Sequence, residues 1–327
     1  MIPIKISNIT IINKHYDAIK KVLDMDIKRK KYLSYNYIDI DNWVKKLTND
    51  KYNLEGLIKA EATELKKIID IITQNPKYNG NDKSKCNHKG SDYSINQFFL
   101  YVYSKFSKNG DCHFKNAGYD ALQLSSDLDI NVCPYCNRNF ISRAKKKSTN
   151  GKEVIIRTAQ LDHFYPESEF PFLALSFYNL IPVCPTCNKI KLVERFGVNP
   201  YAINNSDEHI IFDYDFNGSI KDIKVDTIYR STDFEINWNA LGLEELYQAH
   251  NNYLSDLFIR IKIYNSLYRS DLSKYVKGLS GEKDMEISEI TVDDIKRAIL
   301  GNYFNETDLN KHPLSKLTKD IVRQYLK

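Results

Sequence analysis

Glycine and proline are scarce in this sequence, which has 12 Gly and 9 Pro among 327 residues. Folds built only of strands use both residues often at their turns, so this composition favours helices joined by short polar connections. Hydrophobic residues make up 42% of the chain and aromatic residues 12%. That content is enough for packed cores and excludes a disordered protein.

Long apolar runs are also missing. No segment reaches the roughly 18 consecutive apolar residues that a bilayer-spanning helix needs. The opening MIPIKISNITIINKHYDAIKKVLD has neither the basic start nor the apolar centre of a secretory signal. We therefore expect a cytoplasmic protein without a membrane contact.

Cysteine is infrequent, and the six cysteines of a cytoplasmic chain are better explained as thiols or metal ligands than as disulfides. Four of them form two Cys-x-x-Cys pairs with 47 residues between the pairs: Cys133 with Cys136, and Cys184 with Cys187. Two intervening residues let both thiolates of a turn bind one tetrahedral Zn²⁺ at about 2.3 Å. We predict a structural zinc site with four cysteine ligands, the alternative being buried or redox-active thiols. Because four protein ligands leave no position for a substrate, any catalysis must involve other residues.

The net charge of +5 is unevenly distributed. Residues 133 to 203 contain ten Lys and Arg against five Asp and Glu, and the rest of the chain contains 37 of each kind. This segment carries the whole excess, which favours a polyanion as its partner. For Lys145, Lys146 and Lys147 alone, a solvated lysine-rich loop is an equally good interpretation.

Hydrophobic periodicity predicts the secondary structure. Spacings of three and four residues predict helices in the following segments: 41–50, 54–74, 94–108 with Ser94 or Asp92 as the cap, 119–128, 240–268 and 291 to the C-terminus. Residues 75–92 are rich in turn formers and predict a long loop. A tight turn with extended arms is expected at residues 131–141, a β-branched run at 151–163, and a hairpin around Asn217-Gly218.

Polar residues stand in a fixed order between the two cysteine pairs. Asp162 and His163 are adjacent, Asn179 precedes the apolar Leu-Ile-Pro-Val, and Asn188 directly follows the last cysteine. This order resembles the HNH endonuclease family, whose ββα-metal core has an Asp-His at a strand end, an Asn-Leu in the connecting loop and a His or Asn on the next helix. Asn188 stands where the final His is usual, and Leu192 stands where a Gly is common.

The resemblance implies an α+β, mostly helical fold with a zinc-stapled ββα-metal nuclease module at residues 129–205. An N-terminal helical region would precede it at residues 1–128. A β-hairpin and C-terminal helices would follow at residues 206–327.

Phosphodiester hydrolysis needs a base that activates water and a cation that meets the charge developing on the phosphate. His163 is the expected general base, because an imidazole has a pKa near neutral pH. Asp162 and Asn188 offer oxygen ligands for one Mg²⁺ or Mn²⁺. Successive strand residues point to opposite sides, so Asp162 can face the cation while His163 faces the water. The resemblance implies that Asn179 orients the loop and His163 through backbone hydrogen bonds.

Two basic residues are candidates for substrate phosphates. Lys191 follows Asn188 by three residues on the same helical face, and Arg138 follows the first cysteine pair. A lysine after a knuckle is also often only a solvated side chain. DNA is the first expected substrate, an RNA such as tRNA is the closest alternative, and a non-catalytic zinc-ribbon binding or scaffold protein is the alternative from another class.

A wider resemblance involves CPYCNRNF, LDHFYPESEFPFLALSFYNLIPVCPTCN, NPYA and GNYFNETDLNKHPLSKLTKDIV. These segments look like the HNH nucleases of bacterial anti-phage defence, particularly the PtuB-like component of Septu and certain retron systems. The resemblance implies an anti-phage effector that works with an ATPase partner of the PtuA type. The flanking helices would then be docking surface.

The remaining cysteines have irregular spacing. Cys86 and His88, together with Cys112 and His113, offer two thiols and two imidazoles, but they do not follow a standard finger pattern. A second metal site is one interpretation, and ordinary loop residues are the other.

Overall fold

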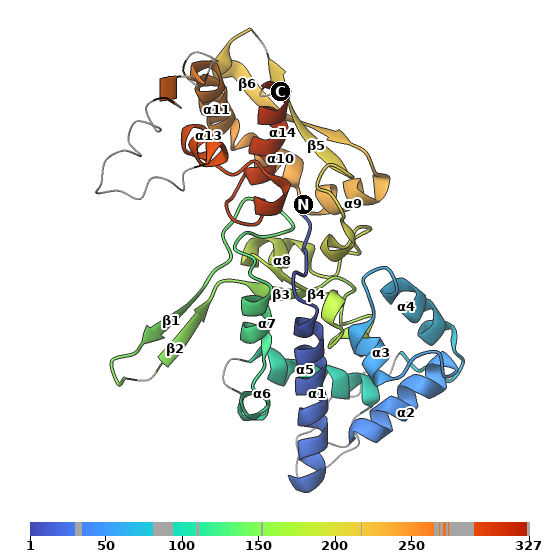
Figure 1. Cartoon of the computed structure of the whole chain (residues 1–327). Helices are drawn as coiled ribbons and strands as arrows, with labels where there is room; N and C mark the ends of the chain where they lie inside the picture. The colour runs from blue at the N-terminus through green and yellow to red at the C-terminus, as the bar shows by residue number, and fades with distance from the viewer. Residues whose placement is uncertain are drawn as a thin grey trace.

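The computed structural model describes residues 1–29, 35–80, 94–108, 111–151, 153–216, 218–264, 268, 271–272, 274 and 291–325. The N-terminal helices lie at one end of the molecule and the C-terminal hairpin and helices at the other (Figure 1). The segment with the cysteine pairs lies between them. The expected mostly helical α+β fold is confirmed.

Helices form the N-terminal part: α1 (Thr10–Arg29), α2 (Tyr37–Thr48), α3 (Leu54–Lys59), α4 (Leu65–Gln74), α5 (Ile95–Ser107), α6 (Cys112–Ala117) and α7 (Ala121–Asp127). Short polar side chains start several of them. Ser94, one of the two caps expected for α5, accepts the backbone N–H of Gln97, and Asp120 caps α7 in the same way. Residues 75–80 of the predicted loop are neither helix nor strand, and residues 81–92 lie outside the described residues.

The apolar stripe of residues 54–74 is divided between α3 and α4. Ala60 leaves the helical conformation, with φ −52° and ψ 128°. Both helices pack against α2, which has 12 residues. One straight helix over this segment would be roughly 30 Å long and would carry part of its apolar face past α2. The break lets both helices bury apolar side chains, among them Leu57 of α3 and Ile68 of α4.

The central segment has the following elements: β1 (Arg143–Lys147), β2 (Glu153–Arg157), β3 (Gln160–His163), η1 (Pro171–Leu173), η2 (Phe177–Asn179), β4 (Leu180–Val183), α8 (Pro185–Lys191) and η3 (Pro200–Ala202). β1 pairs with β2 and β3 with β4, both antiparallel. The β-branched run is thus shared between two antiparallel pairs, β1–β2 and β3–β4. Lys145, Lys146 and Lys147 lie in strand β1, so the loop interpretation of these lysines was wrong.

The C-terminal part has β5 (Ile210–Phe216), η4 (Ile220–Asp222), β6 (Ile223–Tyr229), α9 (Thr232–Ala240), α10 (Leu243–Gln248), α11 (Asn251–Ile263), α13 (Val292–Leu300), η6 (Glu306–Asp308) and α14 (Ser315–Tyr325). The predicted hairpin is confirmed, since β5 pairs antiparallel with β6. Gly218 has φ 85°, a conformation that glycine adopts without strain. Asn217 itself lies outside the described residues.

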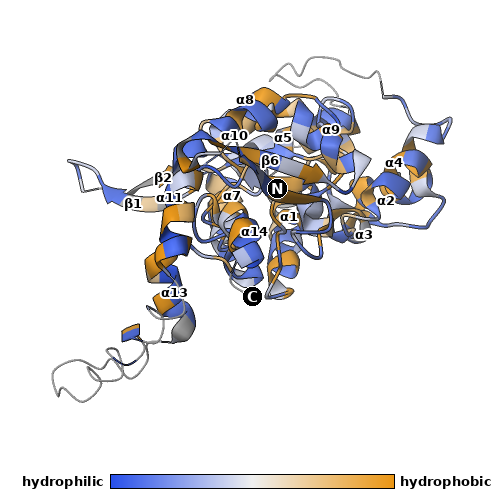
Figure 2. Ribbon diagram, turned by 90° about the horizontal axis from the view of Figure 1, so that it is seen from above, coloured by the Kyte–Doolittle hydropathy of each residue, from blue (hydrophilic) through white to orange (hydrophobic). Residues whose placement is uncertain are grey.

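Buried apolar side chains form one cluster that extends from Met1 to Val322 in α14. The N-terminal segment joins the central one directly, because the N–H of Ile2 donates to the carbonyl of Pro134 at 2.9 Å. The β1–β2 hairpin projects from this body in both views (Figures 1 and 2). The domain boundaries at 128/129 and 205/206 stay predictions. Within the described ranges, no helix has the length and apolar character to cross a membrane.

Candidate active site beside a four-cysteine cluster

The two cysteine pairs meet in space. The sulfur atoms of Cys133, Cys136, Cys184 and Cys187 all lie within 4.8 Å of one another, and all four residues are buried. Burial raises the pKa of the Cys133 thiol, and a cation bound among the four sulfurs would favour its thiolate form. The cluster can hold zinc, as the spacing predicted.

Nitrogen donors surround the sulfurs. The N–H of Arg138 donates to Cys136 Sγ at 3.4 Å, and the side-chain amide of Asn139 donates to Cys184 Sγ at 3.3 Å. Cys184 also caps α8, whose first residue is Pro185. Such donors are the usual outer contacts of metal-bound thiolates.

Asp162 lies on β3 and is 4% exposed. The hydroxyl of Tyr135, from within the first cysteine knuckle, donates to its Oδ2 at 2.6 Å. The ammonium of Lys191 lies 3.3 Å from Oδ1 and 3.2 Å from Oδ2. Burial raises the pKa of Asp162, and Lys191 and Tyr135 oppose that rise. Partners from the knuckle and from α8 therefore favour the ionised form of this buried carboxyl group.

His163 follows at the end of β3 with its ring nitrogens in different surroundings. Nε2 lies 3.1 Å from the carbonyl of Ala174 and donates to it, so Nδ1 carries the lone pair. Nδ1 lies 3.4 Å from Glu167 Oε2, and the ring of Tyr103 packs edge-on with centroids 4.4 Å apart. Burial lowers the pKa of His163 to about 4, so the imidazole is neutral at pH 7.

Asn179 is fully buried between β3 and β4. Its Oδ1 accepts the N–H of Tyr165 at 2.7 Å, and its Nδ2 donates to the carbonyls of Tyr165 and Leu173. Leu173 precedes Ala174, the residue that binds the His163 ring. Asn179 therefore bonds to the backbone of the loop that orients His163, which is the kind of contact expected for it.

A cavity of about 330 Å³ opens beside the end of β3. Asp162, His163 and Asn188 line it together with other side chains: Tyr103, Leu161, Pro166, Glu167, Ser168, Leu192 and Val193. Asn188 donates from Nδ2 to Gln160 Oε1 at 2.8 Å, which leaves Oδ1 as its ligand atom. The three polar residues predicted for one site therefore share one cavity.

A known family matches the segment that contains this cavity. Residues 133–193, called here the HNH segment, match the model of the HNH endonuclease family. The matched span contains both cysteine pairs, β3, β4 and α8. It indicates a metal-dependent nuclease domain with nucleic acid as its partner. No curated protein and no solved structure matches the chain.

Two residues predicted to contact substrate, Lys191 and Arg138, lie outside the lining of this cavity. Lys191 is fully buried, and its ammonium also donates to the carbonyl of His163 at 2.8 Å. Arg138 donates from Nε to His250 at 2.9 Å, in the C-terminal part. Neither residue lines the cavity. The prediction that both residues contact substrate does not fit these positions, because the side chain of each one bonds to a residue far away in the sequence.

Three residues that contact Asp162 or His163 were not predicted from the sequence. Tyr135 binds Asp162, Tyr103 of α5 packs on His163, and Glu167 lies beside Nδ1 of His163. Only Glu167 had a local signal, since it follows His163 by four residues. Leu192, at the position where the resemblance leads us to expect a Gly, has φ 47°, a positive value that glycine adopts more readily than leucine.

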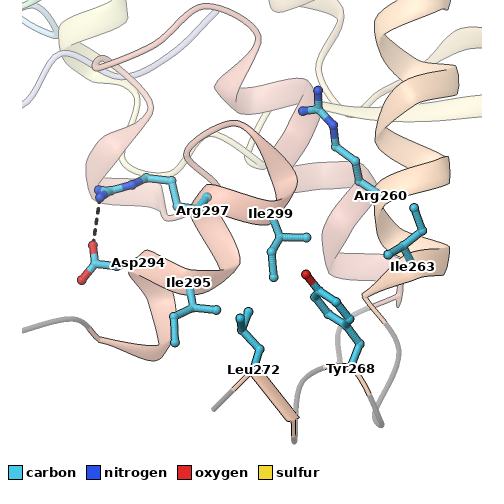
Figure 3. A pocket seen from close by; sticks show the side chains of 9 residues that line it. Arg260, Ile263, Tyr268, Leu272, Asp294, Ile295, Arg297 and Ile299 are labelled. Carbon is cyan, nitrogen blue, oxygen red and sulfur yellow. Dashed lines mark ion pairs between the residues drawn. The ribbon is translucent and has the colours of Figure 1, made fainter. Parts of the chain in front are cut away.

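A larger cavity lies outside the HNH segment. That cavity, of about 760 Å³, lies between α11 and α13, where Ile263, Ile295 and Ile299 face it (Figure 3). Its charged pair, Arg297 and Asp294, is joined by an ion pair at 2.9 Å. It has no histidine or cysteine in its lining, so the smaller cavity is the candidate site.

Only half of the residues considered for a second metal site lie within the described part of the chain. Cys86 and His88 lie outside the described residues. Cys112 and His113 group with Asp111, their ligand atoms within 4.8 Å. Asp111 also caps α6 through the N–H of His113, and its Oδ1 bonds the His113 ring at 2.9 Å. These contacts account for the grouping as a helix start.

Proposed function

We propose that this protein is an endonuclease that hydrolyses phosphodiester bonds of DNA, and that residues 133–193 form its ββα-metal module from β3, β4 and α8. One observation carries the proposal. The Nδ1 side of His163, a neutral imidazole oriented by Ala174, shares a cavity with Asp162 and Asn188 inside the span that matches the HNH family.

His163 is the general base. Its Nε2 proton is committed to the carbonyl of Ala174, so Nδ1 accepts a proton from a water molecule whose oxygen attacks phosphorus. The bond from phosphorus to the leaving oxygen breaks, and that oxygen takes a proton from solvent. Burial keeps the base unprotonated between turnovers.

Asp162 and Asn188 are the residues that would hold a divalent cation, Mg²⁺ or Mn²⁺. A carboxylate and an amide oxygen on one cavity wall are hard ligands that suit such an ion. When bound, the cation would neutralise charge developing on the phosphate and on the leaving oxygen. Zinc at the four cysteines would be structural, because four protein ligands leave no open position.

Lys191, Tyr135 and Asn179 are positioning residues in this proposal. The Lys191 ammonium bonds both the Asp162 carboxylate and the His163 carbonyl, so it fixes the catalytic pair together. Tyr135 holds Asp162 from the zinc knuckle, and Asn179 holds the loop that orients His163. Such contacts keep reacting groups in place without touching substrate.

We also propose a role as an effector of bacterial anti-phage defence with an ATPase partner. The support is the resemblance of the motif segments and of residues 301–322 to PtuB-like nucleases. Expression in phage-sensitive cells, with and without an ATPase of the PtuA type, tests this role by plaque counts. Equal counts with wild type and a His163→Asn variant would contradict it.

The nuclease activity is tested with purified protein on supercoiled plasmid, single-stranded DNA and tRNA, in Mg²⁺, Mn²⁺ or EDTA. We expect plasmid nicking with either cation, none in EDTA, and none from Asp162→Asn. Asp320→Asn is the matched control, because Asp320 is also buried and bonded to a buried lysine, Lys316, at 2.5 Å. Cleavage of tRNA alone would assign the site to RNA, and metal-independent cleavage would contradict the proposal.

A further inference from the structure

The β1–β2 hairpin, called here the arm, comprises residues 143–147 and 153–157 and has no role in the proposed chemistry. It projects from the body of the molecule in two perpendicular views (Figures 1 and 2). Lys146 and Lys147 are exposed, and Ile156 is 46% exposed. An isolated two-stranded ribbon buries little apolar surface, so its own stability does not explain its presence.

The charge of the arm is strongly one-sided. Its two strands contain Arg143, Lys145, Lys146, Lys147 and Arg157 against the single acid Glu153. The strand register aligns Arg143 with Arg157 at the base of the arm and Lys147 with Glu153 at its far end. A ribbon with five basic residues and one acid suits a polyanionic partner.

The root of the arm is fixed next to the candidate active site. The N–H of Thr158 donates to the carbonyl of Ser142 at 2.9 Å, which continues the pairing beyond the strands. Arg157 precedes Asp162 by five residues, so the chain between them spans at most about 18 Å. A polymer bound along the arm therefore passes within a few nucleotides of His163.

We infer that the arm binds the phosphate backbone of duplex DNA and lies against its major groove. This inference rests on the proposed nuclease function and names the form of its substrate. A two-stranded ribbon fits the major groove of B-form DNA, which is about 12 Å wide, whereas the major groove of A-form RNA is too narrow. The strands of the arm contain no aromatic residue on which single-stranded bases could stack.

The test changes Lys145, Lys146 and Lys147 to glutamine together. The control changes three exposed lysines near α4, Lys66, Lys67 and Lys77, in the same way, so the net charge is equal. Binding to duplex DNA, single-stranded DNA and duplex RNA of one sequence is measured by fluorescence anisotropy in EDTA over a salt series. Thermal unfolding midpoints check that both variants fold as the wild type does.

We expect wild type to prefer duplex DNA. The arm variant should lose at least about tenfold in affinity at 0.1 M salt, and its salt slope should fall by about 2 to 3. The control should stay within twofold of wild type. Equal binding by the arm variant and its control, or tighter binding of duplex RNA or single strands, overturns the inference.

Cleavage separates this inference from the proposed function. With Mg²⁺ and saturating plasmid, the arm variant should keep its turnover within about threefold while KM rises. Wild-type protein that binds duplex DNA through the arm but cuts nothing would contradict the nuclease and leave the arm intact. Wild-type protein that cuts DNA with equal KM in the arm variant would contradict the arm alone.

Discussion

Replacing Tyr135 by phenylalanine removes one hydroxyl and leaves the ring, which is fully buried against Phe196 with centroids 5.1 Å apart. The hydroxyl donates to Asp162 at 2.6 Å. A hydrogen bond to a charged group contributes about 1.5 to 3 kcal/mol. Because this bond favours the carboxylate form, its loss should raise the pKa of Asp162 by about 1 to 2.

The consequence is a change in the pH dependence of cleavage. Asp162 must be ionised to hold a cation, so the acidic limb of the rate profile should move to higher pH by the same amount. Zinc content should not change, because all four cysteines remain. The assay is single-turnover plasmid nicking from pH 5 to 9, with bound zinc measured on the same samples.

Tyr247→Phe is the matched control for this prediction. Tyr247 is equally buried beside the cysteine cluster, but its hydroxyl donates to the carbonyl of Cys136 at 2.7 Å. It should cost similar stability and leave the acidic limb where it is. Identical pH profiles for Tyr135→Phe and Tyr247→Phe would refute the coupling between the zinc knuckle and Asp162.

Three further predictions concern stability and metal. Lys191→Met leaves Asp162 buried without its cation and should lower the free energy of unfolding in urea by about 3 to 5 kcal/mol, whereas the exposed Lys189→Met should change it by less than about 0.5 kcal/mol. Purified protein should carry one zinc per chain by elemental analysis, and Cys184→Ser should lose the zinc and the cooperative unfolding transition; disulfides between the cysteines instead would exclude the site. Burial lowers the pKa of His15, like that of His163, to about 4 from the ordinary 6.5. The unfolded chain takes up protons first, so stability should fall as pH drops from about 6.5 toward 4, by about 2 kcal/mol per histidine between pH 7 and pH 5. His15→Gln should remove its share of that fall, and an unchanged pH dependence would contradict the assignment.

The parts of the site that sequence predicted are those with local spacing. Two residues between a pair of cysteines predict a metal-binding knuckle. The adjacent positions of Asp162 and His163 at a strand end predict that their side chains point to opposite sides. Hydrophobic periodicity predicted the helices, and the turn at Gly218 predicted the C-terminal hairpin. Both signals depend on residues that are close to one another in the sequence.

The parts that sequence missed depend on distant partners. Helical spacing places Lys191 on one face with Asn188, but it does not say that this face packs on β3 and buries the ammonium. The partner of Tyr135 lies 27 residues away and that of Arg138 lies 112 residues away. The break at Ala60 likewise depends on the packing of α3 and α4 against α2. Such contacts arise only when the whole core is assembled.

The proposed reaction requires His163 to take the proton from the attacking water. Its most direct test is the single-turnover rate of plasmid cleavage in Mg²⁺ for His163→Asn against His312→Asn, since His312 does not line the cavity. We predict a loss of about 10² to 10⁴ for His163→Asn and a wild-type rate for the control. Equal rates for the two variants would contradict the account.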